Sequence, residues 1–279
     1  MGTENDYHLL DKVTVGSITS QTKQAKESTM SAGDVSAKIQ KTHEGEHHGD
    51  FGNVPIKLTR STYIFVLCAA LNSCNLGYDV GVSTQAGILI QNELSLSNIE
   101  REVWTGSLNF WAMFGALGAQ YITDRWGRRK TFVVSAVIFM LGILITVCSA
   151  KYSVLLVGRL FVGLGLGVGL AVDPLYIAEV TPAKYRGEMV TWAEIALNVG
   201  LVFGFSTSLF LSGLENNAEW RVMILLGAIL PMVMIVCVFT VMPESPRWLA
   251  ANGRPEEARE VLTKIYPDGY NIEPILQDI

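Results

Sequence analysis

Six long apolar stretches, separated by short polar linkers, constrain this chain more than any other feature of its sequence. They run over about residues 62–90, 104–122, 132–150, 154–177, 189–211 and 222–242. Each is close to the ~20 apolar residues that a helix needs to cross a bilayer. In lipid, a spanning segment of this kind must satisfy its own backbone hydrogen bonds, which a helix does. The sequence therefore predicts an all-α membrane protein with six transmembrane helices, and the short linkers make neighbouring helices antiparallel.

The apolar stretches divide the chain into three parts. Residues 1–57 are polar, with few aromatic residues and no helical or strand period, which predicts a disordered cytosolic tail. Residues 58–242 form the six-helix transmembrane bundle. Residues 243–279 form a cytosolic linker, and its Pro-Glu-Glu sequence at 255–257 predicts the start of a short amphipathic helix over 255–265.

The distribution of Lys and Arg predicts the orientation of the bundle. The linkers after the second and fourth stretches carry more of these residues than the three linkers on the other side: Arg125, Arg128, Arg129, Lys130, Lys184 and Arg186 against Arg101, Lys151 and Arg221. Cytosolic loops carry the excess of positive charge. We therefore expect a multi-pass membrane protein with both ends of this chain in the cytosol.

Ionisable residues inside the apolar stretches are candidate functional residues, because each costs ~2.5–3.5 kcal/mol to insert and usually faces a cavity or a partner. Asp79 in the first stretch and Arg159 in the fourth lie at compatible depths for an ion pair. One interpretation is a static pair that solves the burial problem. The other is a titratable carboxylate whose proton and Arg partner exchange as the conformation changes. The spacing alone leaves both open.

A second polar pair lies in the fifth stretch. Glu194 and Asn198 are four residues apart and share one helix face. Together they offer acceptors and donors for a polyhydroxylated ligand, although they could equally bond a neighbouring helix. Asp173, just before Pro174 in the fourth stretch, receives no role from the sequence.

Alternate glycines from Gly163 to Gly169 resemble a nucleotide-binding loop only superficially. The spacing is not G-x-G-x-x-G, and no Lys-Ser/Thr pair follows. Gly165 and Gly169 have G-x-x-x-G spacing in an apolar segment, which is typical of close helix packing. We interpret the run as a packing surface.

Five motifs in order resemble the sugar porter family of the major facilitator superfamily, from about Leu58 to the end of the chain. They are Gly77-Tyr78-Asp79-x-Gly81-Val82, Asp124-Arg125-Trp126-Gly127-Arg128-Arg129, Arg159-x-x-x-Gly163, Tyr176-x-Ala178-Glu179-x-x-Pro182-x-x-x-Arg186-Gly187 and Pro243-Glu244-Ser245-Pro246-Arg247. Within this family, the stretch from Pro243 to Leu249 and the Glu194-x-x-x-Asn198-x-Gly200 pattern look most like plant-type polyol and monosaccharide proton symporters.

The resemblance implies one half of a major facilitator fold, made of two inverted three-helix repeats. Family members have twelve spans and bind substrate between two halves, so we expect a truncated chain or, less simply, a second copy in place of the C-terminal half. The implied partners are a sugar or polyol, protons and membrane lipid, without nucleic acid. We expect the plasma membrane rather than an internal one.

The resemblance also implies roles for residues. Asp79 and Arg159 would couple transport to protons, and Glu194 and Asn198 would bind substrate. A cytosolic gate would consist of Asp124, Arg125, Arg128, Arg129, Glu179, Arg186, Glu244 and Arg247. The implied activity is alternating-access transport rather than enzymatic catalysis, with no cofactor or metal. The alternatives are a facilitative sugar carrier and a non-transporting sensor or regulatory half.

Overall fold

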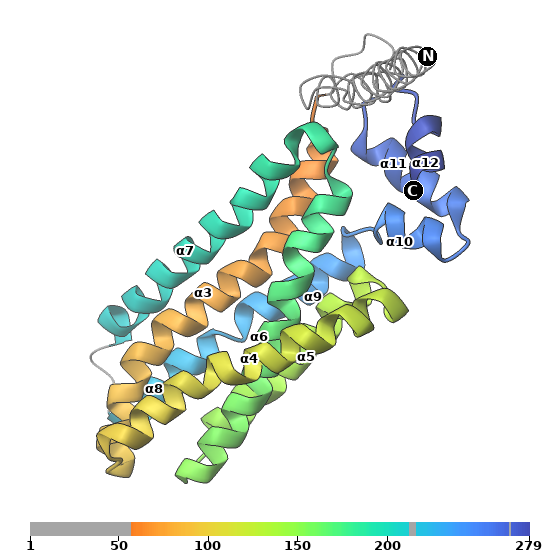
Figure 1. Cartoon of the computed structure of the whole chain (residues 1–279). Coiled ribbons are helices and arrows are strands. Elements are labelled where there is room, and N and C mark those ends of the chain that lie inside the picture. The colour runs from red at the N-terminus through yellow and green to blue at the C-terminus, as the bar shows by residue number, and fades with distance from the viewer. Residues whose placement is uncertain (1–56, 212–215, 268) are drawn as a thin grey trace, which may run out of the picture. The chain divides into compact units, whose positions relative to one another are not determined.

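The computed structural model describes residues 57–211, 216–267 and 269–279, and every regular element within these ranges is helical. The long helices are α3 (Arg60–Leu94), α4 (Asn98–Trp126), α5 (Arg128–Val147), α6 (Tyr152–Val180) and α7 (Arg186–Leu211), followed by α8 (Asn216–Leu226) and α9 (Ile229–Thr240). A 3-10 turn, η1, covers Ala183–Tyr185, and α10 (Pro246–Ala251), α11 (Pro255–Ile265) and α12 (Glu273–Asp278) follow the bundle (Figure 1). The all-α fold class is confirmed. The tail predicted at 1–57 lies outside the described residues except for its last residue.

The helices begin a few residues before the predicted apolar stretches, and the side chains of Thr59 and Ser97 cap the starts of α3 and α4. The clearest case is α4, which starts at Asn98 rather than 104. Ser97 accepts a hydrogen bond from the Glu100 N–H, and the Glu100 carboxylate accepts one from the Ser97 N–H at 2.8 Å. This reciprocal capping box satisfies two backbone donors at the helix start.

Five helical stretches of the described residues are long and apolar enough to cross a membrane, one fewer than predicted. They are α3, α5, α6, residues Ala183–Leu211 and residues Ala218–Thr240. The exception is α4, in which Asn109, Gln120 and several small residues dilute the apolar character. It packs along α6 within the bundle, while Phe110 and Leu117 remain exposed on its outer side. Its packing makes α4 part of the same bundle despite its lower hydropathy.

The sixth predicted span, 222–242, corresponds to residues Ala218–Thr240, which are long and apolar enough to cross a membrane, although the helix is not regular along its whole length. It breaks between α8 and α9, where Gly227 and Ala228 donate to Ile224 and Leu225 carbonyls in tight turns of 3.0 and 2.9 Å. Pro231 follows directly, and its missing N–H removes the helical bond that would reach back to the Gly227 carbonyl. The proline and the preceding glycine therefore account for the break.

The packing of the long helices has the symmetry expected of two inverted repeats. The first helix of each triplet packs on the second helix of the other: α3 on α7, and α6 on α4. The third helix of each triplet packs on the first helix of the other: α5 on α6, and α9 on α3. The structure is therefore consistent with one half of a major facilitator fold.

Glycines allow the backbones of α3 and α7 to touch. A Cβ atom added to Gly77 would lie 1.9 Å from the Leu197 carbonyl oxygen, and one added to Gly200 would lie 2.0 Å from the Cys74 carbonyl oxygen. Gly81 and Gly204 meet one turn further on in the same way. Two G-x-x-x-G motifs thus face each other, which is a close-packing arrangement of membrane helices. We call these four glycines the glycine seam.

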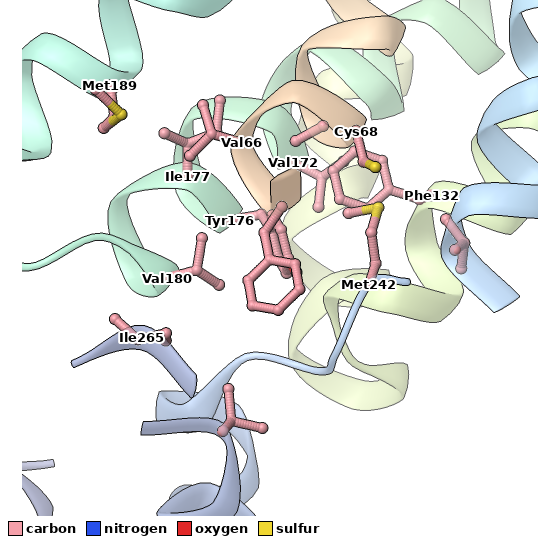
Figure 2. Close-up of a cluster of buried hydrophobic side chains, with 14 of the residues drawn as sticks. Val66, Cys68, Phe132, Val172, Tyr176, Ile177, Val180, Met189, Met242 and Ile265 are labelled. Atoms are coloured by element: carbon pink, nitrogen blue, oxygen red, sulfur yellow. The ribbon is translucent and has the colours of Figure 1, made fainter. Parts of the chain in front are cut away.

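Buried apolar side chains form one cluster near each end of the bundle. The cluster in Figure 2 joins Phe132 of α5 and Tyr176 of α6 to Met242, and Ile265 of α11 also belongs to it. The helix predicted at 255–265 is therefore α11, and it is packed against the bundle rather than free. Thr59, at the start of α3, reinforces the contact by donating to the Lys264 carbonyl at 2.8 Å.

Candidate functional site

A buried ion pair joins the first and fourth predicted spans. Arg159 Nη1 lies 3.0 Å from Asp79 Oδ2, and both residues are almost fully buried. Arg159 Nη2 donates to Ser83 Oγ at 2.6 Å, and Ser83 in turn donates to Asp79 Oδ2 at 3.4 Å. The three side chains form a closed triangle on α3 and α6. Removing one partner of such a buried pair is strongly destabilising, because it leaves an uncompensated charge.

Aromatic packing holds the Arg159 guanidinium in place. Its central carbon lies 3.8 Å from the centroid of the Trp104 ring, which is fully buried on α4. A cation over an indole face gains ~2 kcal/mol or more when desolvated. Arg159 Nε is buried without an acceptor among the described residues. The sequence analysis missed Ser83 and Trp104, although Ser83 is four residues after Asp79 and therefore on its face.

Asp173 is also buried between α3 and α6, but its partners are neutral. Ser73 Oγ donates to Asp173 Oδ2 at 2.6 Å, and Asn72 Nδ2 donates to Asp173 Oδ1 at 3.2 Å. The structure thus places this carboxyl group in a defined polar site that the sequence left without a role.

Glu194 and Asn198 lie on the exposed side of α7 in this chain. They share a helix face, as their spacing predicts, and Asn198 Nδ2 donates to the Glu194 carbonyl at 2.8 Å. Asn198 also lines a shallow depression of about 410 Å³ together with Ile195, Val199, Val202 and Phe203. The polar pair therefore interrupts an apolar surface, and within the described residues no side chain from another helix hydrogen-bonds to it.

At the opposite end from the Asp79 pair, Arg128 is the centre of a cluster of polar contacts. Its Nε and Nη2 atoms donate to the two carboxylate oxygens of Glu179, each at 2.8 Å, in a bidentate pair. Its Nη1 lies 3.6 Å from the exposed carboxylate of Asp124. Glu179 and Arg128 are both largely buried. This pair therefore joins the start of α5 to the end of α6 more firmly than a surface pair would.

Glu244 caps the start of α5. Its carboxylate accepts from the backbone N–H groups of Arg128 at 2.8 Å and Arg129 at 3.1 Å, an arrangement that suits a helix N-terminus. Burial raises the pKa of this carboxyl group, while the N–H donors of Ser245, Arg129 and Arg128 oppose the increase. Gly127 makes the approach possible, because its φ of 90° and missing side chain leave room for the carboxylate.

The remaining predicted gate residues do not all join this cluster. Arg129 donates to the Val238 and Phe239 carbonyls at the end of α9, and Arg186 donates to the Ala178 carbonyl. Arg247 shares a small cavity of about 50 Å³ with Glu179 and Arg186. Arg125 is exposed and contacts Tyr121 Oη at 3.4 Å. Backbone carbonyls therefore accept hydrogen bonds from Arg129 and Arg186, whereas Arg128 pairs with a carboxylate.

A polar cluster at the other end of the bundle was missed by the sequence analysis. Glu93, at the end of α3, accepts from Trp220 Nε1 and from Arg221 Nη1, the latter at 3.0 Å. Arg221 also donates to the Val147 and Ser149 carbonyls. The contacts join α3 and α8 to the end of α5. Glu93 could not be predicted as a member of this cluster from the sequence, because a charged residue is common at the end of a helix.

A groove of about 810 Å³ lies among Trp126, Arg129, Phe239, Trp248 and Lys264, and neither Asp79 nor Arg159 lines it. No group of three or more His, Cys, Asp or Glu side chains in the described ranges could hold a metal ion.

Comparison with known proteins identifies relatives of this arrangement. Residues 65–275 match the family described as "Sugar (and other) transporter". Probable polyol transporter 4 of Arabidopsis thaliana is 40% identical over 196 residues, which cover 70% of this chain and 37% of that protein. The glucose transporter GlcP of Staphylococcus epidermidis is 31% identical over 206 residues, covering 74% of this chain and 45% of that protein. The chain thus spans less than half the length of these relatives.

Solved structures show the same fold. The proton:xylose symporter XylE, bound to 6-bromo-6-deoxy-D-glucose, superimposes with a TM-score of 0.69 at 24% identity, covering 73% of this chain and 49% of that one. An inward-open structure of XylE from E. coli gives a TM-score of 0.69 at 22% identity, covering 78% of this chain and 55% of that one.

Proposed function

Because this chain belongs to the Sugar (and other) transporter family of the major facilitator superfamily, we propose that it moves a monosaccharide or polyol across a membrane by proton symport with alternating access. The named relatives are transporters of polyols and glucose, and their likeness to the chain supports the substrate class. Substrate would bind at Glu194 and Asn198, which lie on the exposed side of α7. A second six-span half would complete that site.

The observation that carries proton coupling is the buried pair of Asp79 and Arg159. A buried carboxylate facing a single guanidinium is stable when ionised, and protonation would release the guanidinium to Ser83 alone. Proton binding and the conformation of the α3–α6 pair are therefore linked, as symport requires. We propose that Asp79 binds the transported proton and that Arg159 sets its affinity.

The test is transport by the complete carrier in liposomes with an imposed proton gradient. Asp79→Asn should abolish accumulation of polyol against its gradient while leaving exchange of labelled substrate measurable. Glu256→Gln is the control, because this carboxylate is exposed on α11, outside the predicted proton, substrate and gate residues, and the variant should accumulate normally. If Asp79→Asn still concentrates substrate to the wild-type level, Asp79 is not the coupling site, whereas a wild type that never concentrates substrate would support the facilitative alternative.

Membrane side is part of the same proposal. We propose that α10 to α12 and both ends of the chain lie in the cytosol, a topology supported by the excess of Lys and Arg after the second and fourth spans. The plasma membrane is the proposed location.

A further inference from the structure

Asp173 on α6 is a buried carboxyl group that the proposed function does not use. It is 1% exposed, and both of its oxygens accept hydrogen bonds from α3, from Ser73 at 2.6 Å and from Asn72 at 3.2 Å. In the described part of the chain it has no ion-pair partner. Its site is therefore polar but electrically neutral.

The site is built into the helix surface rather than left over from imperfect packing. A Cβ atom at Gly169 would lie 2.1 Å from Asn72 Nδ2, so the missing side chain at Gly169 creates the space that the Asn72 carboxamide fills. Gly169 is one turn before Asp173 on the same face of α6. The glycine run thus supplies a recess for a polar group, in addition to the packing surface predicted from the sequence.

No charged group of the surrounding helices reaches the Asp173 carboxyl group. The titratable side chains on the elements around it include Cys68, Cys74, Tyr78 and Asp79 on α3, Arg159, Tyr176 and Glu179 on α6, Cys237 on α9, and Arg128 and Arg129 at the start of α5. Among the described contacts, none of these is hydrogen-bonded or ion-paired to Asp173. Glu194 on the adjacent α7 is exposed on the other side of that helix.

The two buried carboxyl groups of the α3–α6 pair therefore have opposite environments. Asp79 faces a guanidinium, whereas Asp173 faces a hydroxyl and a carboxamide. An isolated buried carboxylate is so costly that such a group normally binds a proton and becomes neutral. Environments that separate two carboxyl groups in this way separate their protonation states.

We propose that Asp173 is a second proton-binding site of the bundle, which holds a proton while Asp79 is ionised. Ser73 and Asn72 are its positioning residues. A serine hydroxyl can donate to a carboxylate and accept from a protonated carboxyl group, so Ser73 serves both states without moving. The inference concerns proton binding by itself, and only its connection to transport rests on the proposed function.

A polar stripe on α3 connects the two sites. Asn72, Asn75 and Asp79 follow each other at i, i+3 and i+7 and therefore share one face of the helix. Asn75 Oδ1 is buried without a donor among the described residues. Ser73 and Asp79 are six residues apart, about 9 Å along the helix axis. The second proton thus binds about two turns from the coupling pair, on the cytosolic side of it.

Infrared difference spectroscopy of the complete protein in lipid tests this inference directly, because a protonated carboxyl group has its own C=O stretching band. On titration, the wild type should show a buried-carboxyl band that is absent in Asp173→Asn and retained in Asp79→Asn. Asn keeps the shape and hydrogen bonds of the site, so a purely structural Asp173 would leave the spectrum unchanged in this variant. Asp124→Asn, at an exposed carboxylate, is the control.

A second variant guards against misfolding of the first. Ser73→Ala removes the donor to Oδ2 and should shift the Asp173 band to higher frequency while leaving the other carboxyl bands in place. Identical spectra for wild type, Asp173→Asn and Ser73→Ala would overturn the inference. Failure of the wild type to accumulate substrate would contradict the proposed symport, but it would not remove the Asp173 band, so the two proposals fail separately.

Discussion

At the scale of single residues, the ionisable side chains buried between α3 and α6 have different surroundings. Arg159 is held by a carboxylate, a hydroxyl and an indole face, and Asp173 is held by neutral donors. Glu194 instead points out of this bundle. An exposed charge on the α7 surface costs little in water but would be costly against lipid. Its position therefore fits a polar cavity better than a lipid-facing surface.

The role proposed for Glu194 gives a prediction about substrate preference. An ionised carboxylate only accepts hydrogen bonds, so it favours ligands rich in hydroxyl donors. Losing one charged hydrogen bond costs about 1.5–3 kcal/mol, roughly ten- to a hundredfold in affinity. Glu194→Gln should therefore weaken polyol binding by about that factor and hexose binding by less, as measured by substrate-induced tryptophan fluorescence of the complete carrier.

The matched control for Glu194 is Glu188, an exposed residue two turns earlier on α7. Glu188→Gln should leave both affinities unchanged. Equal affinities for polyol and hexose before and after the Glu194 substitution would remove this residue from the binding site.

Sequence alone was more informative about buried charges than about their neighbours. The depth of Asp79 and Arg159 in their spans predicted that they could meet, because rise per residue fixes depth along a helix. The partners Asn72, Ser73, Ser83 and Trp104 are uncharged, and only the packing and rotation of α3, α4 and α6 bring them to the buried charges. Helix rotation is a property of packing, which the apolar pattern of a membrane helix does not encode strongly.

At the scale of helices, the sequence predicted well which helices exist and roughly where they begin and end, but it did not predict the break within the sixth span. The apolar stretches are long, so their core is unmistakable, and caps such as Ser97 only extend the ends. The break at Gly227 was missed because the hydropathy continues unchanged through it. The glycine run of α6 was correctly interpreted as a packing surface, but its members face different helices: Gly167 meets α4 and Gly165 meets α5.

The glycine seam predicts a strong dependence of stability on side-chain size. Gly200→Ala would put a Cβ atom 2.0 Å from the Cys74 carbonyl oxygen, which the backbone of α3 can relieve only by moving away. Overpacking of this kind costs about 1–3 kcal/mol. We expect a lower thermal unfolding temperature in detergent, measured by the loss of the monodisperse peak after heating.

Gly187→Ala in the same helix is the control, because nothing lies within 4 Å of the added atom. It should be neutral or slightly stabilising, since Ala is ~1 kcal/mol better than Gly in a helix. Equal unfolding temperatures for Gly200→Ala and the wild type would show that the backbones do not touch as described.

At the scale of the whole molecule, the arginines after the second span can serve both the orientation of the bundle in the membrane and specific contacts within it. Positive charge after the second and fourth spans is enough to orient a bundle. The forked contact of Arg128 with both oxygens of Glu179 adds a geometric requirement that charge alone does not impose. The resemblance to sugar porters indicated the members of this cluster, and the structure separates Arg128 from Arg125, which has no such contact.

This difference predicts opposite outcomes for two conservative substitutions in one linker. Arg128→Lys keeps the charge but loses the bidentate geometry, so we expect normal insertion with a population shifted towards inward-facing states by a few-fold. Arg125→Lys should behave like the wild type. Labelling of a cysteine placed in the inner vestibule of the complete carrier measures the shift. Unchanged labelling and transport in Arg128→Lys would mean that the arginine serves topology alone.

The glycine seam also limits which helices can move relative to one another. Gly77 and Gly81 fit against Gly200 and Gly204 with no side chain between the two backbones, so sliding one helix along the other would drive backbone into backbone. The glycine seam therefore prevents the two helices from sliding, so we expect the first and fifth spans to move together as one rigid unit. In the proposed transport cycle, we expect bending where such backbone contact is absent, for example at the break at Gly227 in the sixth span.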